Sequence, residues 1–182
     1  MYLGITRMDK TYHSRTNISN EVLLLMAKVS ALTKQLNGLT LAEQPQKQEI
    51  IKELFGSVGS NPFVGDNFHC DFGKNIHVGE NFHADYNCTM LDLAEIRIGD
   101  NCLIGPDVGI YTAGHRLEPE GRIADVYGLP ITIGHDVWIG GLGRRATKIC
   151  TPMSRHTWRR PGKRHSKSFM RICSMGEIIR RR

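Results

Sequence analysis

A six-residue repeat in the middle of the chain constrains its fold more than any other feature. Each repeat places an aliphatic residue before a glycine, often followed by an acid and an asparagine, as in Val78-Gly79-Glu80-Asn81. Similar segments begin at Val64, Ile98, Ile104 and Ile133. A repeat this short is typical of a solenoid of stacked strands, in which each coil buries its apolar row against the next. The repeat therefore predicts a parallel β-helix.

The spacing within the repeat indicates which side chains point inward. Aliphatic residues recur six positions apart, and a small or apolar residue follows four positions later. The inward residues predicted in this way are Val78, Ala84, Met90, Ile98, Ile104, Ile110, Ile133 and Ile139, followed by Phe82, Cys88, Ala94, Cys102, Val108 and Val137 at the second position. The repeated glycine and asparagine suit corners where the backbone needs an unusual φ. A β-sandwich, the alternative, would instead show period-two runs and irregular turn spacing.

Two amphipathic segments precede the repeat. Apolar side chains recur at steps of three and four over residues 18–36, which predicts a helix. Asn17 or Ser19 could cap it, and Asn37-Gly38 would end it. A second helix is predicted from about Pro45 to Phe55. Both helices are expected to cover the open end of the solenoid.

Three regions follow from these patterns. They are a helical cap over residues 1–57, a β-helix over 58–141 and a basic tail without hexads over 142–182. Residues 111–130 interrupt the β-helix, contain no hexad and are rich in polar side chains. A polar loop that projects from a rigid repeat is where function usually lies.

The basic tail accounts for the positive charge of the chain. Residues 142–182 hold 13 Lys and Arg against the single acid Glu177, whereas residues 1–141 hold 11 Lys and Arg against 17 acids. A basic tail can bind polyanions, but no recognisable nucleic-acid module is present, so no nucleic-acid partner is expected. Our hypothesis is that a shifted reading frame encodes residues 142–182, because the composition changes suddenly there. The alternative is a real basic extension that binds an acidic partner.

Composition also predicts the compartment. No run of about 18 apolar residues predicts a membrane span, and the N-terminus lacks the pattern of a signal peptide. The five cysteines form no C-x-x-C pair, which argues against a disulfide framework or a structural zinc site. A reduced, cytoplasmic protein is expected, with Cys88 and Cys102 as packed thiols.

The repeat region resembles the maltose/galactoside O-acetyltransferases of the hexapeptide-repeat family. The motifs that carry the resemblance are Lys52-Glu53-Leu54-Phe55-Gly56, Asn75-Ile76-His77-Val78-Gly79-Glu80-Asn81-Phe82, Asn87-Cys88-Thr89-Met90-Leu91-Asp92, Ile98-Gly99-Asp100-Asn101, Tyr111-Thr112-Ala113-Gly114-His115, Pro130-Ile131-Thr132-Ile133-Gly134 and Val137-Trp138-Ile139-Gly140-Gly141. The resemblance implies a left-handed β-helix with an N-terminal α-helical cap. It also implies a homotrimer with active sites between subunits, acetyl-CoA as acetyl donor and a sugar as acceptor.

His115 matches the catalytic histidine of this family. A sugar hydroxyl is barely ionised at pH 7, so its attack on a thioester needs a general base, and histidine has a pKa near neutrality. The resemblance therefore implies that His115 is the base. The alternative is a histidine that only forms hydrogen bonds within its loop.

The resemblance assigns the acceptor side to Asp71, Asp85, Asn87 and Asp92. Asp71 and Asp92 match positions that contact the sugar or orient groups near the histidine. Asp85 stands where the family often has an asparagine that donates to the oxyanion, with Asn87 two residues later. Because a carboxylate is a poor donor, either a backbone amide substitutes or Asp85 serves the acceptor. The alternative for each acid is a solvated corner.

The acetyl-CoA side is assigned to Asp85, Trp138, Gly140 and Gly141. An exposed Trp138 would flank the pantetheine arm, whereas a packed one would only fill a corner. After Gly141 the family continues with more hexads, but Arg145 stands here where an aliphatic residue is required. A non-catalytic scaffold without a complete CoA site is therefore an alternative function.

Three histidines raise a second alternative, a metal enzyme like the γ-type carbonic anhydrases of a related fold. His69, His77 and His83 are separated by eight and six residues. These spacings place them on successive faces rather than converging on one ion. No metal is therefore expected.

Overall fold

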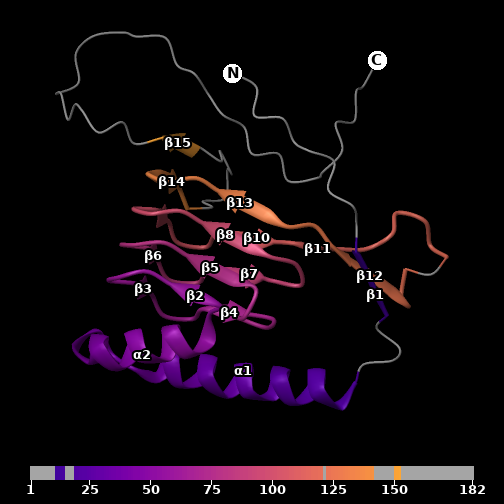
Figure 1. Ribbon diagram of the computed structural model, residues 1–182, viewed down its shortest axis with the longest axis horizontal. Coiled ribbons are helices and arrows are strands. Elements are labelled where there is room, and N and C mark those ends of the chain that lie inside the picture. Colours follow the sequence, from indigo (N-terminus) through magenta and orange to yellow (C-terminus); the bar gives the residue numbers. More distant parts are fainter. Residues whose placement is uncertain (1–10, 15–18, 121, 142–149, 153–182) are drawn as a thin grey trace, which may run out of the picture.

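The computed structural model describes residues 11–14, 19–120, 122–141 and 150–152. Short parallel strands stack as coils above two helices, so the described chain is a parallel β-helix with a helical cap (Figure 1). The predicted basic tail lies outside the described residues, except for strand β15 (Cys150–Pro152).

The two predicted helices are present and close the first coil. They are α1 (Asn20–Gly38) and α2 (Gln44–Leu54), joined by the short helix η1 (Leu41–Glu43). Ser19 caps α1, because its side chain accepts a hydrogen bond from the backbone N of Val22 at 3.4 Å. Of the two predicted caps, Ser19 is therefore the one used.

Two polar contacts fix the cap to the first coil. The side-chain amide of Asn37 donates to the backbone O of Phe68 and accepts from its backbone N, both at 2.9 Å. Lys47 is fully buried, and its Nζ donates to Oδ1 of Asp66 at 2.7 Å. Without these bonds, the helices would cover the backbone groups of Phe68 and the charge of Lys47 and leave them without these hydrogen-bond partners.

The coils contribute strands to three sheets. The first sheet contains β2 (Ser57–Val58), β5 (Ile76–Val78), β8 (Ile96–Ile98) and β13 (Ile131–Ile133). The second contains β3 (Phe63–Val64), β6 (His83–Ala84), β9 (Leu103–Ile104) and β14 (Val137–Ile139), with β15 antiparallel to β14. The third contains β4 (His69–Cys70), β7 (Thr89–Leu91) and β10 (Gly109–Tyr111). The solenoid therefore begins at Ser57, before the first hexad.

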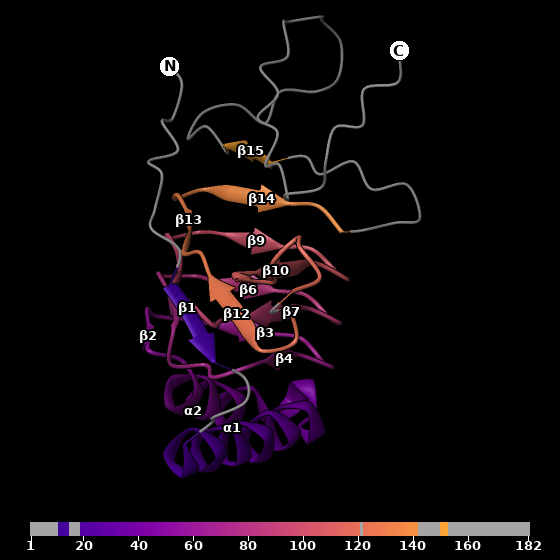
Figure 2. The same ribbon diagram turned by 90° about the vertical axis from the view of Figure 1, so that its right-hand side faces the viewer.

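The segment at 111–130, expected as a loop, is partly an antiparallel arm. It contains β11 (Ala113–Gly114) and β12 (Asp125–Gly128), which pair with each other. The strand β1 (Thr11–Ser14) pairs with the other side of β12 (Figure 2). Because the insertion has no coil to stack on, its backbone groups find partners within the arm and in β1.

The core consists of the inward residues that the hexads predict. The eight aliphatic positions from Val78 to Ile139 are all buried, as are most of the second positions, whereas Ala94 and Val137 are half-buried. Cys88 and Cys102 are buried free thiols. Burial raises the pKa of Cys88 to about 11, which makes this thiol unreactive at neutral pH.

At the described corners of the coils, positive φ is found mainly at asparagine and aspartate. The residues are Asn61, Asn67, Asn81, Asn87, Asn101, Asp107 and Asp136, and Gly73, which is not a glycine of the repeat, has a φ of +69°. The asparagine and aspartate side chains form ladders between coils, as in the bond from Asn81 to Asn101 at 2.9 Å. The expectation of an unusual φ at the repeated glycines is wrong. At Gly65, for example, a Cβ would lie 2.7 Å from the backbone N of Tyr86, so glycine is needed for close stacking.

Candidate functional site

One corner of the β-helix gathers two of the four residues predicted to serve the acceptor, together with the predicted base. Asp71 directly follows β4 and Asp92 directly follows β7, while His115 directly follows β11, four residues after the end of β10. Because β4, β7 and β10 are parallel neighbours, their carboxyl ends meet at one edge of the third sheet. Neighbouring strands are about 4.8 Å apart, so Asp71 lies roughly 10 Å below the level of β10. We call this edge the acceptor corner.

Asp92 organises the backbone of the acceptor corner. It is fully buried, and its Oδ1 accepts hydrogen bonds from the backbone N of Asp71 at 3.0 Å and of Phe72 at 2.9 Å. Its Oδ2 accepts from the backbone N of Asn75 at 3.3 Å. Burial raises the pKa of Asp92, and the backbone bonds oppose that rise. The carboxylate therefore holds the turn that presents Asp71 and does not itself reach the surface.

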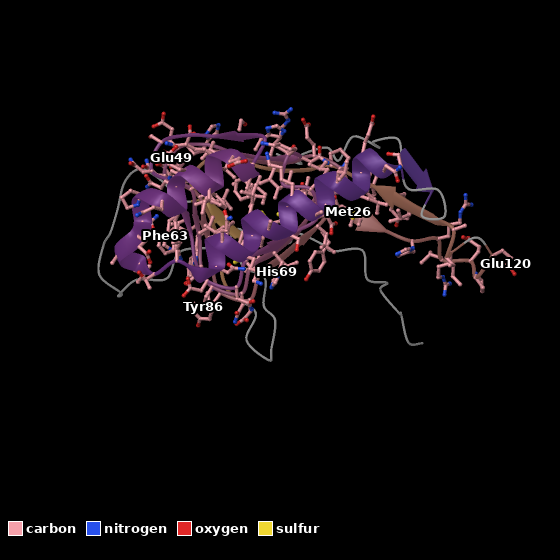
Figure 3. The ribbon with its side chains drawn as sticks, turned by 90° about the horizontal axis from the view of Figure 1, so that it is seen from below. Met26, Glu49, Phe63, His69, Tyr86 and Glu120 are labelled. Atoms are coloured by element: carbon pink, nitrogen blue, oxygen red, sulfur yellow. The ribbon has the colours of Figure 1, made fainter. Side chains whose placement is uncertain are left out.

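Asp71 lines an open groove between α1 and the end of β4. The groove has a volume of about 630 Å³ and is lined by Met26 and Lys34 from α1 and by His69 and Asp71 from the coil. Figure 3 shows Met26 and His69 along the same side of α1. Burial raises the pKa of Asp71, and the neighbouring charge of Asp92 raises it further. Asp71 is thus a half-buried acid facing a groove large enough for a small ligand.

His115 is held by the backbone of its own arm. Its Nδ1 lies 3.1 Å from the backbone O of Arg122. The Nε of Arg122 donates to the backbone O of Arg116 at 3.0 Å, and its guanidinium also donates to the backbone O of Leu117. Since a carbonyl oxygen can only accept, the neutral ring carries its proton on Nδ1. The other nitrogen, Nε2, is then the one that can accept a proton.

Sequence reasoning missed two residues that shape this arm. Thr112 is buried, and its Oγ1 donates to the backbone O of Leu91 at 2.6 Å and accepts from the backbone N of Ala94 at 2.9 Å. Thr112 lies in the quoted motif before His115, so its position was visible, but its role was not. No spacing marks Arg122, whose contact depends on how the arm folds back.

A second corner holds the residues predicted for acetyl-CoA. Asp85 directly follows β6 and Gly140 directly follows β14, so both lie at the carboxyl edge of the second sheet. Asp85 is half-buried, and its Oδ1 accepts from the backbone N of Tyr86 at 2.9 Å. A Cβ at Gly140 would meet nothing within 4 Å, whereas one at Gly141 would lie 2.7 Å from a backbone O in the coil below. We call this edge the donor corner.

Trp138 lies on the outer face of the second sheet. Its side chain is 48% exposed, and it stands opposite Leu103, which is 38% exposed. The indole is therefore an exposed surface group on β14 and not a packed corner residue. This placement leaves an aromatic face open beside the donor corner.

Asn87 is already engaged within the fold. Its backbone has a φ of +59°, its Nδ2 donates to Oδ1 of Asp107 at 3.0 Å, and its Oδ1 accepts from Asn67 at 2.8 Å. The side chain is thus a link in a corner ladder. A contact from Asn87 to the sugar remains a prediction and would compete with these bonds.

The three histidines that raised a metal hypothesis lie on three different sheets. His69 is in β4, His77 in β5 and His83 in β6, as the spacing predicts. Among the described residues, no group of three or more His, Cys, Asp or Glu could hold a metal ion.

Comparison with known proteins places this arrangement in a family. The chain is 39% identical to a maltose O-acetyltransferase from Clostridium difficile 630, with a TM-score of 0.69 over 72% of this chain and 70% of that one. It is 34% identical to a galactoside acetyltransferase solved in complex with coenzyme A, with a TM-score of 0.66 over 69% and 63% of the two chains. It is also 45% identical over 126 residues to nodulation protein L from Rhizobium leguminosarum bv. viciae, covering 68% of this chain and 64% of that protein. No family model matches the chain.

These likenesses define the class of the protein. The fold is a left-handed parallel β-helix with an N-terminal helical cap, as the resemblance implied. The chain belongs to the hexapeptide-repeat acetyltransferases of the maltose and galactoside O-acetyltransferase type. It spans less than two thirds of the length of two of the three proteins compared, namely 63% and 64%. No helix in the described part of the chain is long and apolar enough to cross a membrane.

Proposed function

We propose that this chain is an acetyl-CoA-dependent O-acetyltransferase for a sugar hydroxyl of the maltose, glucose or galactoside type. His115 acts as general base within a ternary complex of protein, sugar and acetyl-CoA. The observation that carries this proposal is the bond between Nδ1 of His115 and the backbone O of Arg122, at 3.1 Å. This bond assigns the ring proton to Nδ1, so Nε2 is the nitrogen that acts as base, and His115 follows the same sheet edge as the acid that faces the groove.

The chemistry assigned to His115 is a proton transfer. Nε2 takes the proton of the sugar hydroxyl while the hydroxyl oxygen bonds to the acetyl carbonyl carbon. The carbon–sulfur bond of the thioester then breaks, and the imidazolium returns the proton to the leaving thiolate. A base of this kind typically accelerates such a reaction by 10²–10⁴-fold.

The two acids of the acceptor corner have different roles in this proposal. Asp71 lines the groove and accepts a hydrogen bond from a sugar hydroxyl, because a carboxylate is a strong acceptor for such a donor. Asp92 is fully buried and positions Asp71 through the backbone. An ionised Asp85 has no hydrogen to donate to the oxyanion. In this proposal it therefore contacts the acceptor sugar or the end of acetyl-CoA.

The donor corner fits acetyl-CoA in its residue types. The exposed indole of Trp138 offers an apolar face for the pantetheine arm, and Gly140 leaves its surroundings open. Within one chain, the width of the third sheet separates the donor corner from the acceptor corner. We therefore infer that a complete site pairs the acceptor corner of one copy with the donor corner of its neighbour, in a homotrimer. Light scattering should give the mass of three chains.

The test is thiol release from acetyl-CoA by the purified full chain across a sugar panel. Sugar-dependent release is expected, with a loss of about 10²-fold or more in His115→Gln. His135→Gln is the matched control, because His135 is exposed on another corner and pairs with Asp100 at 3.0 Å. Folded protein that releases no thiol with any sugar would contradict the proposal and favour the scaffold alternative.

A further inference from the structure

Three polar side chains are linked on the first sheet, away from both corners described above. Ser57 in β2 stands directly opposite His77 in β5, and Glu95 directly precedes β8, the next strand of the sheet. Oγ of Ser57 lies 2.9 Å from Nδ1 of His77, and Nε2 of the same ring lies 3.5 Å from Oε1 of Glu95. A hydroxyl, an imidazole and a carboxylate therefore follow one another across neighbouring coils.

The carboxylate of Glu95 decides which nitrogen of His77 carries the proton. A carboxylate can only accept, and a neutral imidazole has one donor and one acceptor nitrogen. With Glu95 next to Nε2, the proton lies on Nε2, so Nδ1 is left to accept from the hydroxyl of Ser57. The ring can then take the proton of Ser57, and the positive charge that it gains lies beside the carboxylate.

The surroundings hold the imidazole and the carboxylate in place. A Cβ at Gly56 would lie 2.6 Å from Cε1 of His77, so the ring packs directly against the backbone of a glycine, and its side chain is 24% exposed. Arg97 donates to both carboxylate oxygens of Glu95, at 2.9 and 2.5 Å, which fixes the plane of the carboxylate. Ser57 itself is exposed, so its hydroxyl is open to a reagent from solvent.

We propose that Ser57 is a base-activated nucleophile that accepts an acetyl group from an activated ester or thioester. A nucleophile within hydrogen-bond reach of a base, which a third group orients, is the arrangement that covalent catalysis uses. Oγ of Ser57 bonds to the acetyl carbonyl carbon, and its proton passes to Nδ1 of His77. The bond from that carbon to the leaving oxygen or sulfur breaks, and the imidazolium returns the proton to the leaving group. The products are an acetyl ester on Ser57 and a free alcohol or thiol, and Glu95 acts as a positioning residue.

The exposed position of Ser57 sets the expected rate. Water solvates an oxyanion that forms at an exposed hydroxyl, in place of the preorganised donors of an enclosed site, so the acceleration comes from the base. A general base contributes typically 10²–10⁴-fold. Ser57 should therefore be acetylated at least about 100-fold faster than an exposed serine that bonds to a carboxylate instead of a histidine. Ser60 is such a serine, because its Oγ donates to Oε2 of Glu80 at 3.0 Å.

The test incubates the full chain carrying His115→Gln with 4-nitrophenyl acetate, or with acetyl-CoA, in the absence of sugar. Fragment mass spectrometry locates each acetyl group, and hydroxylamine, which removes esters but not amides, separates serine labels from lysine labels. We expect an ester on Ser57 that forms at least about 100-fold faster than one on Ser60. His77→Gln should remove this advantage, because glutamine can still bond to Ser57 but cannot take its proton. His135→Gln, the matched control, should keep it.

These outcomes are independent of sugar acetylation, because the His115→Gln background lacks the base of the proposed function. Label on Ser57 from either donor supports the proposal, and label from only one of them identifies the acetyl source. Glu95→Gln should slow the labelling of Ser57 and leave that of Ser60 unchanged, a difference that a general loss of structure would not produce. Equal labelling of Ser57 and Ser60, no ester on Ser57 from either donor, or undiminished labelling in His77→Gln would overturn the proposal.

Discussion

Asp92→Ala is expected to destabilise the acceptor corner strongly. The buried carboxylate accepts bonds from three backbone N–H groups at 3.0, 2.9 and 3.3 Å. A hydrogen bond to a charged group contributes roughly 1.5–3 kcal/mol, so the three together contribute on the order of 5 kcal/mol. Burial disfavours the ionised form and raises its pKa, which offsets part of this gain. We expect a net loss of about 3 kcal/mol in the free energy of unfolding.

The assay is urea unfolding at pH 7, followed by circular dichroism at one protein concentration, because the stability of an oligomer depends on concentration. Asp85→Ala is the matched control. Asp85 also follows a strand at a corner, but within the described part of the chain its carboxylate accepts only the bond from the adjacent Tyr86, at 2.9 Å. Asp85→Ala should lose less than about 1 kcal/mol in the free energy of unfolding. Equal stabilities of the two variants would refute the reasoning that Asp92 organises the turn.

Other perturbations test separate parts of the structure. Asp71 has a raised pKa in the folded protein, so the stability it confers is full below the unfolded pKa of about 3.9 and is lost as pH rises through its folded pKa. Asp71→Asn should therefore raise the melting temperature near pH 7 and leave it unchanged near pH 3, while acetyl transfer falls; a lower melting temperature at pH 7 would contradict this. Asn81 has a φ of +52°, so Asn81→Ala should cost about 1 kcal/mol more than Asn81→Gly in urea unfolding, and the reverse order would be evidence against strain at the corner. In urea unfolding, Lys47→Ala should lose about 2 kcal/mol more free energy of unfolding than Lys47→Met. The reason is that the buried stem of Lys47 packs the cap, while Asp66, the ion-pair partner of Lys47, remains exposed. Equal losses would mean that the charge of Lys47, not its packing, dominates.

The solenoid was predictable because its period is encoded in side-chain size. Each inward position faces the same kind of position one coil away, so Val78, Ile98 and Ile133 had to be apolar whatever surrounds them. The role of the repeated glycine was not predictable in the same way. It depends on how closely the next coil approaches, which spacing alone does not reveal.

For the candidate site, the sequence pointed to the residues more clearly than to the role of each one. The motif around His115 singled out the histidine, but the carbonyl of Arg122 that fixes its tautomer comes from across the arm. Asp92 looked like a sugar ligand in the sequence, yet its burial against the turn at Asp71 gives it a structural task. The groove depends on α1, whose polar and apolar flank residues carry no motif.

The most direct test of the central claim is mass analysis of the sugar after incubation with acetyl-CoA and the purified full chain. The account predicts a sugar that gains one acetyl group as an ester with wild-type protein. It predicts almost none with His115→Gln, whose fold and oligomeric mass should match the wild type. Undiminished acetylation by His115→Gln would contradict the assignment of the base.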